Sequence, residues 1–175
     1  MSSGVMWIWT PKMQKWNLKS LTKEIVLGLV LVFIVTNIIS YIRKPTLDST
    51  QLPPLEVQLI DGSHFSVQKS KPLLIHFWAT WCPTCKLEAA NIERVSKSYE
   101  VLTIAVNSGS EDDIEKYMKE NALSFKVLSD PNGIWAKKFK VQAYPTTFIY
   151  DENAKLKFTE VGYTSTAGLL ARLAL

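Results

Sequence analysis

The chain has 175 residues, with 20 Lys and Arg, 16 Asp and Glu, two Cys and a formal net charge of +4. This length allows one ordinary domain and an appendage. Residues 1–45 carry six of the basic residues and one acid, so the remainder has a net charge of −1. A nearly neutral remainder argues against a basic nucleic-acid-binding surface, and we predict no nucleic-acid partner.

Residues 25–42 form an uncharged apolar run, IVLGLVLVFIVTNIISYI. A helix of that length extends roughly 27 Å, which is enough to cross the hydrocarbon core of a bilayer. A buried core helix is the alternative, but this segment is apolar on all sides. A cleaved signal peptide is the other alternative, although the preceding segment is long and no small-x-small cleavage site follows. We therefore predict an uncleaved transmembrane helix.

The charges on either side of this run predict its orientation. The flanking basic residues are Lys12, Lys15, Lys19 and Lys23 before the run and Arg43 and Lys44 after it. An excess of Lys and Arg before the span keeps the N-terminus in the cytoplasm. The predicted organisation is a cytoplasmic segment at 1–24, a transmembrane helix at 25–42, a linker at 43–54 and a periplasmic domain at 55–175.

Strands and helices alternate along the predicted domain. The predicted strands are 55–59, 64–67, 73–79, 101–106, 125–128, 146–150 and 155–161, and the predicted helices are 83–98, 110–121, 134–139 and 165–175. Asp61-Gly62 is a typical hairpin turn between the first two strands. Ser110 with Asp113 resembles a capping box, and residues 130–133 are predicted to be simply a turn. The alternation predicts an α/β sheet covered on both faces.

The two cysteines lie in Trp81-Cys82-Pro83-Thr84-Cys85, between the strand at 73–79 and the following helix. A helix N-terminus carries partial positive charge and free N–H groups, which favour a thiolate. The two intervening residues bring the second sulfur within bonding distance of the first. This spacing predicts a redox site in which Cys82, exposed at the edge of the sheet, is the nucleophile and Cys85 is the resolving thiol.

Two other uses of the cysteines are less consistent with the sequence. A structural disulfide that closes so short a loop restricts the unfolded chain little. A zinc site needs about four ligands, and only His64 and His76 could join the cysteines. We therefore predict no metal and no bound cofactor.

The stretch HFWATWCPTCKLE at residues 76–88, together with YPTTF at residues 144–148, resembles bacterial thioredoxin-like proteins. The similarity is to the membrane-anchored TlpA/ResA/DsbE type, and most of all to the copper-sensitivity suppressor ScsD branch. It covers roughly residues 50–175. The resemblance implies a thioredoxin-like fold with an N-terminal β-hairpin and a central α-β insertion, preceded here by one transmembrane helix.

The resemblance also assigns roles to residues around the cysteines. Pro145 is expected to be cis and to face the cysteine pair, which leaves the N–H and C=O of Tyr144 free to bind an extended substrate strand. Many relatives have Thr or Val in place of Tyr144, so its larger side chain is expected to affect which partner fits. Trp81 is expected to shield the disulfide with apolar area.

His76 and Glu88 are each open to two interpretations. His76 replaces the buried acid of thioredoxins and either shuttles the proton of the resolving cysteine, with a pKa near neutrality, or is a hydrogen-bonded core residue. Glu88 matches the acid of the W-C-x-x-C-x-x-E pattern that tunes the resolving thiol. The proline that usually follows is replaced by Ala89, so Glu88 could instead lie on the solvated surface.

The dipeptide Pro83-Thr84 between the cysteines is expected to tune the redox poise. It differs from the Gly-Pro of reducing thioredoxins and from the Pro-His of the oxidant DsbA. Thr84 can donate a hydrogen bond but carries no charge. We therefore expect thiolate stabilisation between those two extremes.

The resemblance implies a thiol–disulfide oxidoreductase anchored in the bacterial inner membrane. Its partners would be cysteine-containing periplasmic proteins, with electrons from a DsbD-type membrane protein, and a reductant is favoured over an oxidase. The ScsD similarity suggests a link to copper tolerance.

Alternatives to this function are a thiol reductant for cytochrome c maturation, a protein-disulfide oxidase and a Cu(I)-binding module. A peroxidase is disfavoured because Ala79 replaces the Thr of Thr-x-x-Cys, and a redox-inactive adaptor because both cysteines are present.

Overall fold

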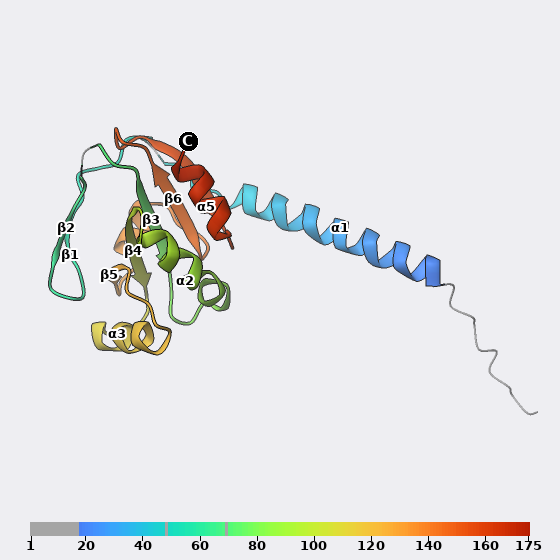
Figure 1. Ribbon diagram of the computed structural model, residues 1–175, viewed down its shortest axis with the longest axis horizontal. Coiled ribbons are helices and arrows are strands. Elements are labelled where there is room, and N and C mark those ends of the chain that lie inside the picture. The colour runs from blue at the N-terminus through green and yellow to red at the C-terminus, as the bar shows by residue number, and fades with distance from the viewer. Residues whose placement is uncertain (1–17, 48, 69) are drawn as a thin grey trace, which may run out of the picture. The chain divides into compact units, whose positions relative to one another are not determined.

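The computed structural model describes residues 18–175 except 48 and 69, with side chains from residue 21 onward. The chain divides into two units, Met1–Ile38 and Ile39–Leu175. Figure 1 shows the long helix and the α/β domain.

Helix α1, Leu18–Ile42, contains a stretch long and apolar enough to cross a membrane, Leu21–Ile42. It extends the predicted range of 25–42 toward the N-terminus, because residues 18–24 include neither Gly nor Pro to stop it. Two polar side chains in the stretch hydrogen-bond to the helix itself. Thr36 Oγ1 donates to Val32 O at 2.9 Å, and Asn37 Nδ2 donates to Phe33 O at 2.7 Å. These bonds lower the cost of placing both residues in an apolar environment.

The domain is built on a five-stranded sheet in the order β5-β4-β3-β6-β7. The strands are β3 Leu73–Trp78, β4 Glu100–Val106, β5 Lys126–Asp130, β6 Thr146–Tyr150 and β7 Leu156–Val161. Strands β3, β4 and β5 are parallel, whereas β6 is antiparallel to both β3 and β7. A separate hairpin pairs β1, Glu56–Gln58, with β2, His64–Ser66. This arrangement confirms the predicted thioredoxin-like fold with its N-terminal hairpin.

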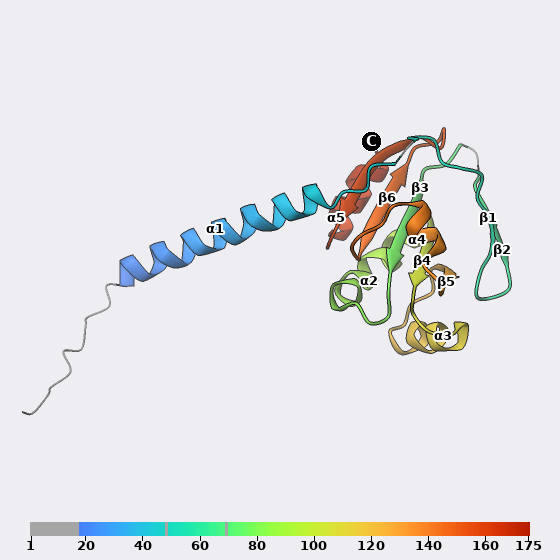
Figure 2. The same ribbon diagram turned by 180° about the vertical axis from the view of Figure 1, so that it is seen from behind.

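Helices cover both faces of the sheet. They are α2 Pro83–Ser96, α3 Glu111–Glu120, α4 Ile134–Lys138 and α5 Thr166–Leu173. Apolar residues of α2, α3 and α5 share one core cluster, and those of α4 and the hairpin share the other. In Figure 1 α2 and α5 lie in front of the sheet, and in Figure 2 α4 lies in front of it.

Side-chain alternation along β3 divides its residues between these two clusters. Ile75 and Phe77 belong to the cluster with α4, and Leu74 and Trp78 to the cluster with α2. Because successive side chains of a strand point to opposite faces, His76 lies on the α2 face, together with the cysteines.

Two local predictions need correction. Residues 130–133 are more than a turn: Asp130 ends β5, is buried, and accepts the N–H groups of Ile134 at 2.7 Å and Ala136 at 2.9 Å. Its carboxylate therefore holds the first turn of α4, whose N–H groups lack partners within the helix.

The folded domain also begins before residue 55, because Leu52 is buried in the core and Gln51 pairs with Lys155. The capping box of Ser110 and Asp113 is confirmed.

Candidate active site

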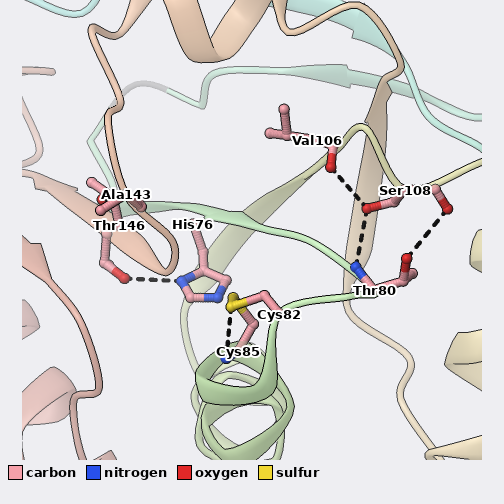
Figure 3. Close-up of a disulfide and its surroundings, with 9 residues drawn as sticks. His76, Thr80, Cys82, Cys85, Val106, Ser108, Ala143 and Thr146 are labelled. Carbon is pink, nitrogen blue, oxygen red and sulfur yellow. Dashed lines mark hydrogen bonds between the residues drawn. A yellow bond between two sulfur atoms is a disulfide. The ribbon is translucent and has the colours of Figure 1, made fainter.

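Cys82 lies where β3 ends and α2 begins, and a disulfide joins it to Cys85 (Figure 3). The N–H of Cys82 donates to Ala79 O at 3.2 Å, which closes a turn between the strand and the helix. Cys82 is the N-cap residue of α2, and its Sγ accepts the N–H of Cys85 at 3.2 Å. Pro83 occupies the first helical position, where a missing N–H costs nothing. The reactive sulfur thus lies at the positive end of the helix.

Neither cysteine is widely exposed in the disulfide form. Cys82 is 5% exposed and Cys85 is 2% exposed, so the expectation of an exposed Cys82 is not met. Both sulfurs belong to the core cluster on the α2 face, and Tyr144 packs against that cluster. Thr84 is half-buried, and its hydroxyl makes no hydrogen bond within the described part of the chain.

The Tyr144–Pro145 peptide bond is cis, as predicted. Pro145 directly precedes β6, and Thr146 pairs with Phe77 near the end of β3 that leads to Cys82. Pro145 O accepts the N–H of Gly162 at 2.9 Å. The main-chain N–H and C=O of Tyr144 have no hydrogen-bond partner among the described residues, so they are available to another chain.

An aromatic pair lies beside this segment. The ring centroids of Trp81 and Tyr144 are 5.8 Å apart and the rings are nearly perpendicular, at 87°. Trp81 is 60% exposed, and its Nε1 donates to Asn107 O at 3.0 Å. Burial raises the pKa of Tyr144, and the negative charge of Asp130 raises it further. Trp81 therefore packs on Tyr144 and leaves most of its surface to solvent.

His76 is a buried, neutral residue. Its Nδ1 lies 2.9 Å from Thr147 Oγ1, its direct neighbour on β6. Burial lowers the pKa of His76 from 6.5 to about 3. The expected near-neutral pKa is therefore wrong, because an apolar environment disfavours the imidazolium. The contact with Thr147 supports the alternative that His76 is a hydrogen-bonded core residue.

Glu88 is fully buried on α2, one turn after Cys85. Its Oε1 accepts the N–H of Thr164 at 3.2 Å, and Oε2 has no partner within the described residues. Burial raises the pKa of Glu88 from 4.5 to about 8, and the bond from Thr164 only partly opposes this. The solvated-surface interpretation is therefore wrong. The sequence misled because a Glu among charged helical neighbours normally faces water.

Two polar residues that no sequence motif indicated, Asn91 and Ser108, support the site. Asn91 Nδ2 donates to Tyr163 Oη and to Thr164 O, both at 3.1 Å, and its Oδ1 accepts the Thr166 hydroxyl at 2.9 Å. Ser108 Oγ accepts the N–H of Thr80 at 3.1 Å. Both residues act across long sequence separations, so no local motif could identify them.

The sequence profile of the AhpC/TSA family matches residues 49–159. A thioredoxin-like protein of Haemophilus influenzae is 32% identical over 152 residues, which cover 84% of this chain and 90% of that protein. The thioredoxin-like protein YneN of Bacillus subtilis is 35% identical over 123 residues, covering 66% of this chain and 72% of YneN. A thioredoxin-family thiol:disulfide interchange protein of Chlorobium tepidum superposes with a TM-score of 0.64 at 26% identity, covering 74% of this chain and 97% of that one.

The chain therefore belongs to the AhpC/TSA family. Its relatives include thiol–disulfide oxidoreductases of the ResA and DsbE types. Fold, cysteine pair and relatives together define a thioredoxin-like thiol–disulfide oxidoreductase.

Proposed function

We propose that this chain is a membrane-anchored reductant of protein disulfides that works in the bacterial periplasm. The observation that carries the proposal is the position of Cys82. Its sulfur caps α2 and accepts the N–H of Cys85, close to a cis-proline segment with free main-chain groups. A sulfur at this place is stabilised as a thiolate, and a cysteine-bearing strand can bind beside it.

The reaction proceeds by two exchanges. The Cys82 thiolate attacks one sulfur of a partner's disulfide, forms a mixed disulfide and releases the partner's other sulfur as a thiolate. Cys85 then loses its proton and attacks Cys82, which releases the partner's second thiolate and forms the Cys82–Cys85 disulfide. Two electrons pass to the partner, and each released thiolate takes up a proton. No bound cofactor is needed, because the two sulfurs carry both electrons.

Glu88 is the residue that we propose tunes Cys85. It lies one turn further along α2, and its pKa of about 8 is close to that of an ordinary thiol. A carboxyl group of this pKa holds a proton at neutral pH and can exchange it with little cost. His76, with its pKa of about 3, is neutral throughout that range.

We propose that Tyr144 and Pro145 bind the substrate. An extended partner segment would pair with the main chain of Tyr144, as strands do at a sheet edge. The Tyr144 ring, in contact with Trp81, would then restrict which partner side chains fit beside the sulfurs. We also propose that Pro83 and Thr84, the two residues between the cysteines, tune the reduction potential of the cysteine pair.

The proposed location follows from α1 and its flanking charges. The stretch Leu21–Ile42 is long and apolar enough to anchor the chain, and the excess of lysine before its uncharged part at residues 25–42 favours a cytoplasmic N-terminus. A reductant in the periplasm needs electrons from the cytoplasm, which suggests a DsbD-type membrane donor. A membrane-impermeant maleimide should label the reduced cysteines in spheroplasts, and labelling only after lysis would contradict this orientation.

The partner can be identified with Cys85→Ser. This variant retains the attacking sulfur but lacks the resolving one, so mixed disulfides on Cys82 should accumulate. Cys82→Ser is the matched control and should trap nothing. Capture of copper-stress proteins would support the link to copper tolerance implied by the ScsD resemblance. Capture of apocytochromes would support a role in cytochrome c maturation.

Direction can be measured by equilibrating the chain with glutathione redox buffers. A reductant should have a potential below that of the glutathione couple, whereas a potential well above it would indicate an oxidase. A Cu(I)-binding module would instead show stoichiometric binding that survives a moderate chelator. That result, without disulfide exchange, would overturn the proposal.

A further inference from the structure

The turn between β3 and Cys82 is hydrogen-bonded to the loop that follows β4. Thr80 and Trp81 are the central residues of this turn, which the bond from Cys82 N–H to Ala79 O closes. The N–H of Thr80 donates to Ser108 Oγ, and the indole of Trp81 donates to Asn107 O. Both central residues are thus held by the segment that follows β4.

Ser108 is buried and has a defined hydrogen-bond arrangement (Figure 3). Its hydroxyl donates to Val106 O at 3.0 Å and accepts the N–H of Thr80 at 3.1 Å. A hydroxyl has one proton, so donation to Val106 leaves its lone pairs directed to Thr80. A longer contact, 3.4 Å from Thr80 Oγ1 to Ser108 O, joins the same two residues in the opposite sense.

The loop that carries Ser108 is itself rigidly held. Asn107 has a left-handed backbone, with φ of 47°, and its N–H donates to Asp130 O at 3.1 Å. Gly109 follows with φ of 91°, where a Cβ would lie 2.7 Å from Asp113 Oδ2. Ser110 then begins α3 with its capping box. Ser108 is therefore a fixed support for the turn.

We infer that Ser108 is a positioning residue for disulfide exchange: its buried hydroxyl fixes the turn before Cys82 and thereby sets the reactivity of the Cys82 thiolate. The inference rests on the proposed function only in taking Cys82 as the attacking sulfur. Thiolate stabilisation at a helix start depends on the distance and angle between the sulfur and the N–H groups. Without the Ser108 hydroxyl, the Thr80 N–H loses its partner and the turn is free to shift.

The test compares Ser108→Ala with wild type in the full-length, reduced protein. Alkylation of Cys82 by iodoacetamide, followed by peptide mass spectrometry across pH, gives the pKa of that thiol. We expect the midpoint to rise by at least about half a unit, so that alkylation at pH 7 slows roughly threefold. The reduction potential should become more negative, because the reduced form loses thiolate stabilisation.

Thr103→Val is the matched control for a purely structural effect. Thr103 is buried on β4, and its hydroxyl donates to Lys126 O at 2.9 Å, away from the turn. Thr103→Val should lose about as much stability as Ser108→Ala but leave the midpoint of Cys82 alkylation unchanged. Ser108→Thr, which keeps a hydroxyl, should have the wild-type midpoint. A Ser108→Ala variant that is destabilised but titrates like wild type would overturn the inference.

Amide hydrogen exchange tests the same point in the wild-type protein, whether or not Ser108→Ala folds. The inference requires the Thr80 N–H to stay protected in the reduced state. Exchange of that amide at the rate of an open loop would overturn it. Neither readout depends on the direction of electron flow, so the inference and the proposed function can fail separately.

Discussion

Glu88 Oε1 lies 3.2 Å from the main-chain nitrogen of Thr164, and this bond links α2 to the connection before α5. It is the only hydrogen bond of this carboxyl within the described residues, although the group is fully buried. Burial with so few partners explains why the pKa of Glu88 is raised to about 8. Glu88 therefore holds its proton at neutral pH at the expense of stability.

Glu88→Gln should make the protein more stable at neutral and alkaline pH. Below pH 4.5 Glu88 is protonated in both folded and unfolded states; between 4.5 and 8 only the unfolded state releases the proton, so stability falls as pH rises. Removing this effect should gain on the order of 2–3 kcal/mol at pH 7. Urea unfolding of both proteins at pH 4 and pH 7 would measure it. An equal difference at the two pH values would show that the carboxyl does not titrate in this range.

The same substitution tests the proposed tuning of Cys85. The amide that replaces the Glu88 carboxyl cannot exchange a proton in this range, so the titration of Cys85 should shift in the reduced protein. Site-specific alkylation of Cys85 across pH measures this shift. Unchanged titration of both cysteines would assign Glu88 a structural role only.

His76→Asn should flatten the acid limb of the stability profile. The folded pKa of about 3 lies below the ordinary 6.5, so stability is fully present above pH 6.5 and is lost as pH falls toward 3. Asn carries no titrating group but can retain a hydrogen bond to Thr147. Thermal unfolding at pH 4.5 and pH 7.5 should show a smaller difference for the variant than for wild type. His64→Asn, on the exposed side of β2, is the matched control.

Tyr144→Thr should make the reduced Cys82 more accessible. The substitution removes the ring that packs on Trp81 and on the cluster containing both sulfurs. Iodoacetamide should then react with Cys82 faster, on the order of threefold. Tyr99 also packs against this cluster, but beyond the far end of α2, so Tyr99→Thr should leave this rate unchanged. A slower reaction of Tyr144→Thr would mean that Tyr144 activates the sulfur instead of covering it.

Asn91→Ala should destabilise the domain by roughly 2–3 kcal/mol. The substitution removes three hydrogen bonds that connect α2 to residues 163–166. Denaturant unfolding at pH 7 measures the loss. Asn121→Ala removes one bond, to Tyr117 O, and should cost less than half as much.

The fold and the cysteine pair could be predicted from local sequence because their signals are local. Each signal is contained in a few consecutive residues: the apolar run of β4, the Asp-Gly turn, and the capping box of Ser110 and Asp113. The surroundings of the cysteines depend on contacts that local patterns do not encode. Thr147 meets His76 only through the register of β6 on β3, and Thr164 reaches Glu88 only when α5 packs on α2. The charge states of His76 and Glu88 depend on burial, so local sequence does not predict them.

In the disulfide form the sulfur of Cys82 accepts the amide proton of Cys85, and a thiolate at the same place would accept it more strongly than a neutral disulfide sulfur does. The negative charge of the Cys82 thiolate would therefore contribute to the unfolding free energy of the reduced protein. By a thermodynamic cycle, the difference in unfolding free energy between the two forms equals 2F times the difference in reduction potential of the disulfide/dithiol couple between the folded and unfolded chains. Calorimetry of the two forms would consequently give the shift that folding imposes on the reduction potential of the cysteine pair.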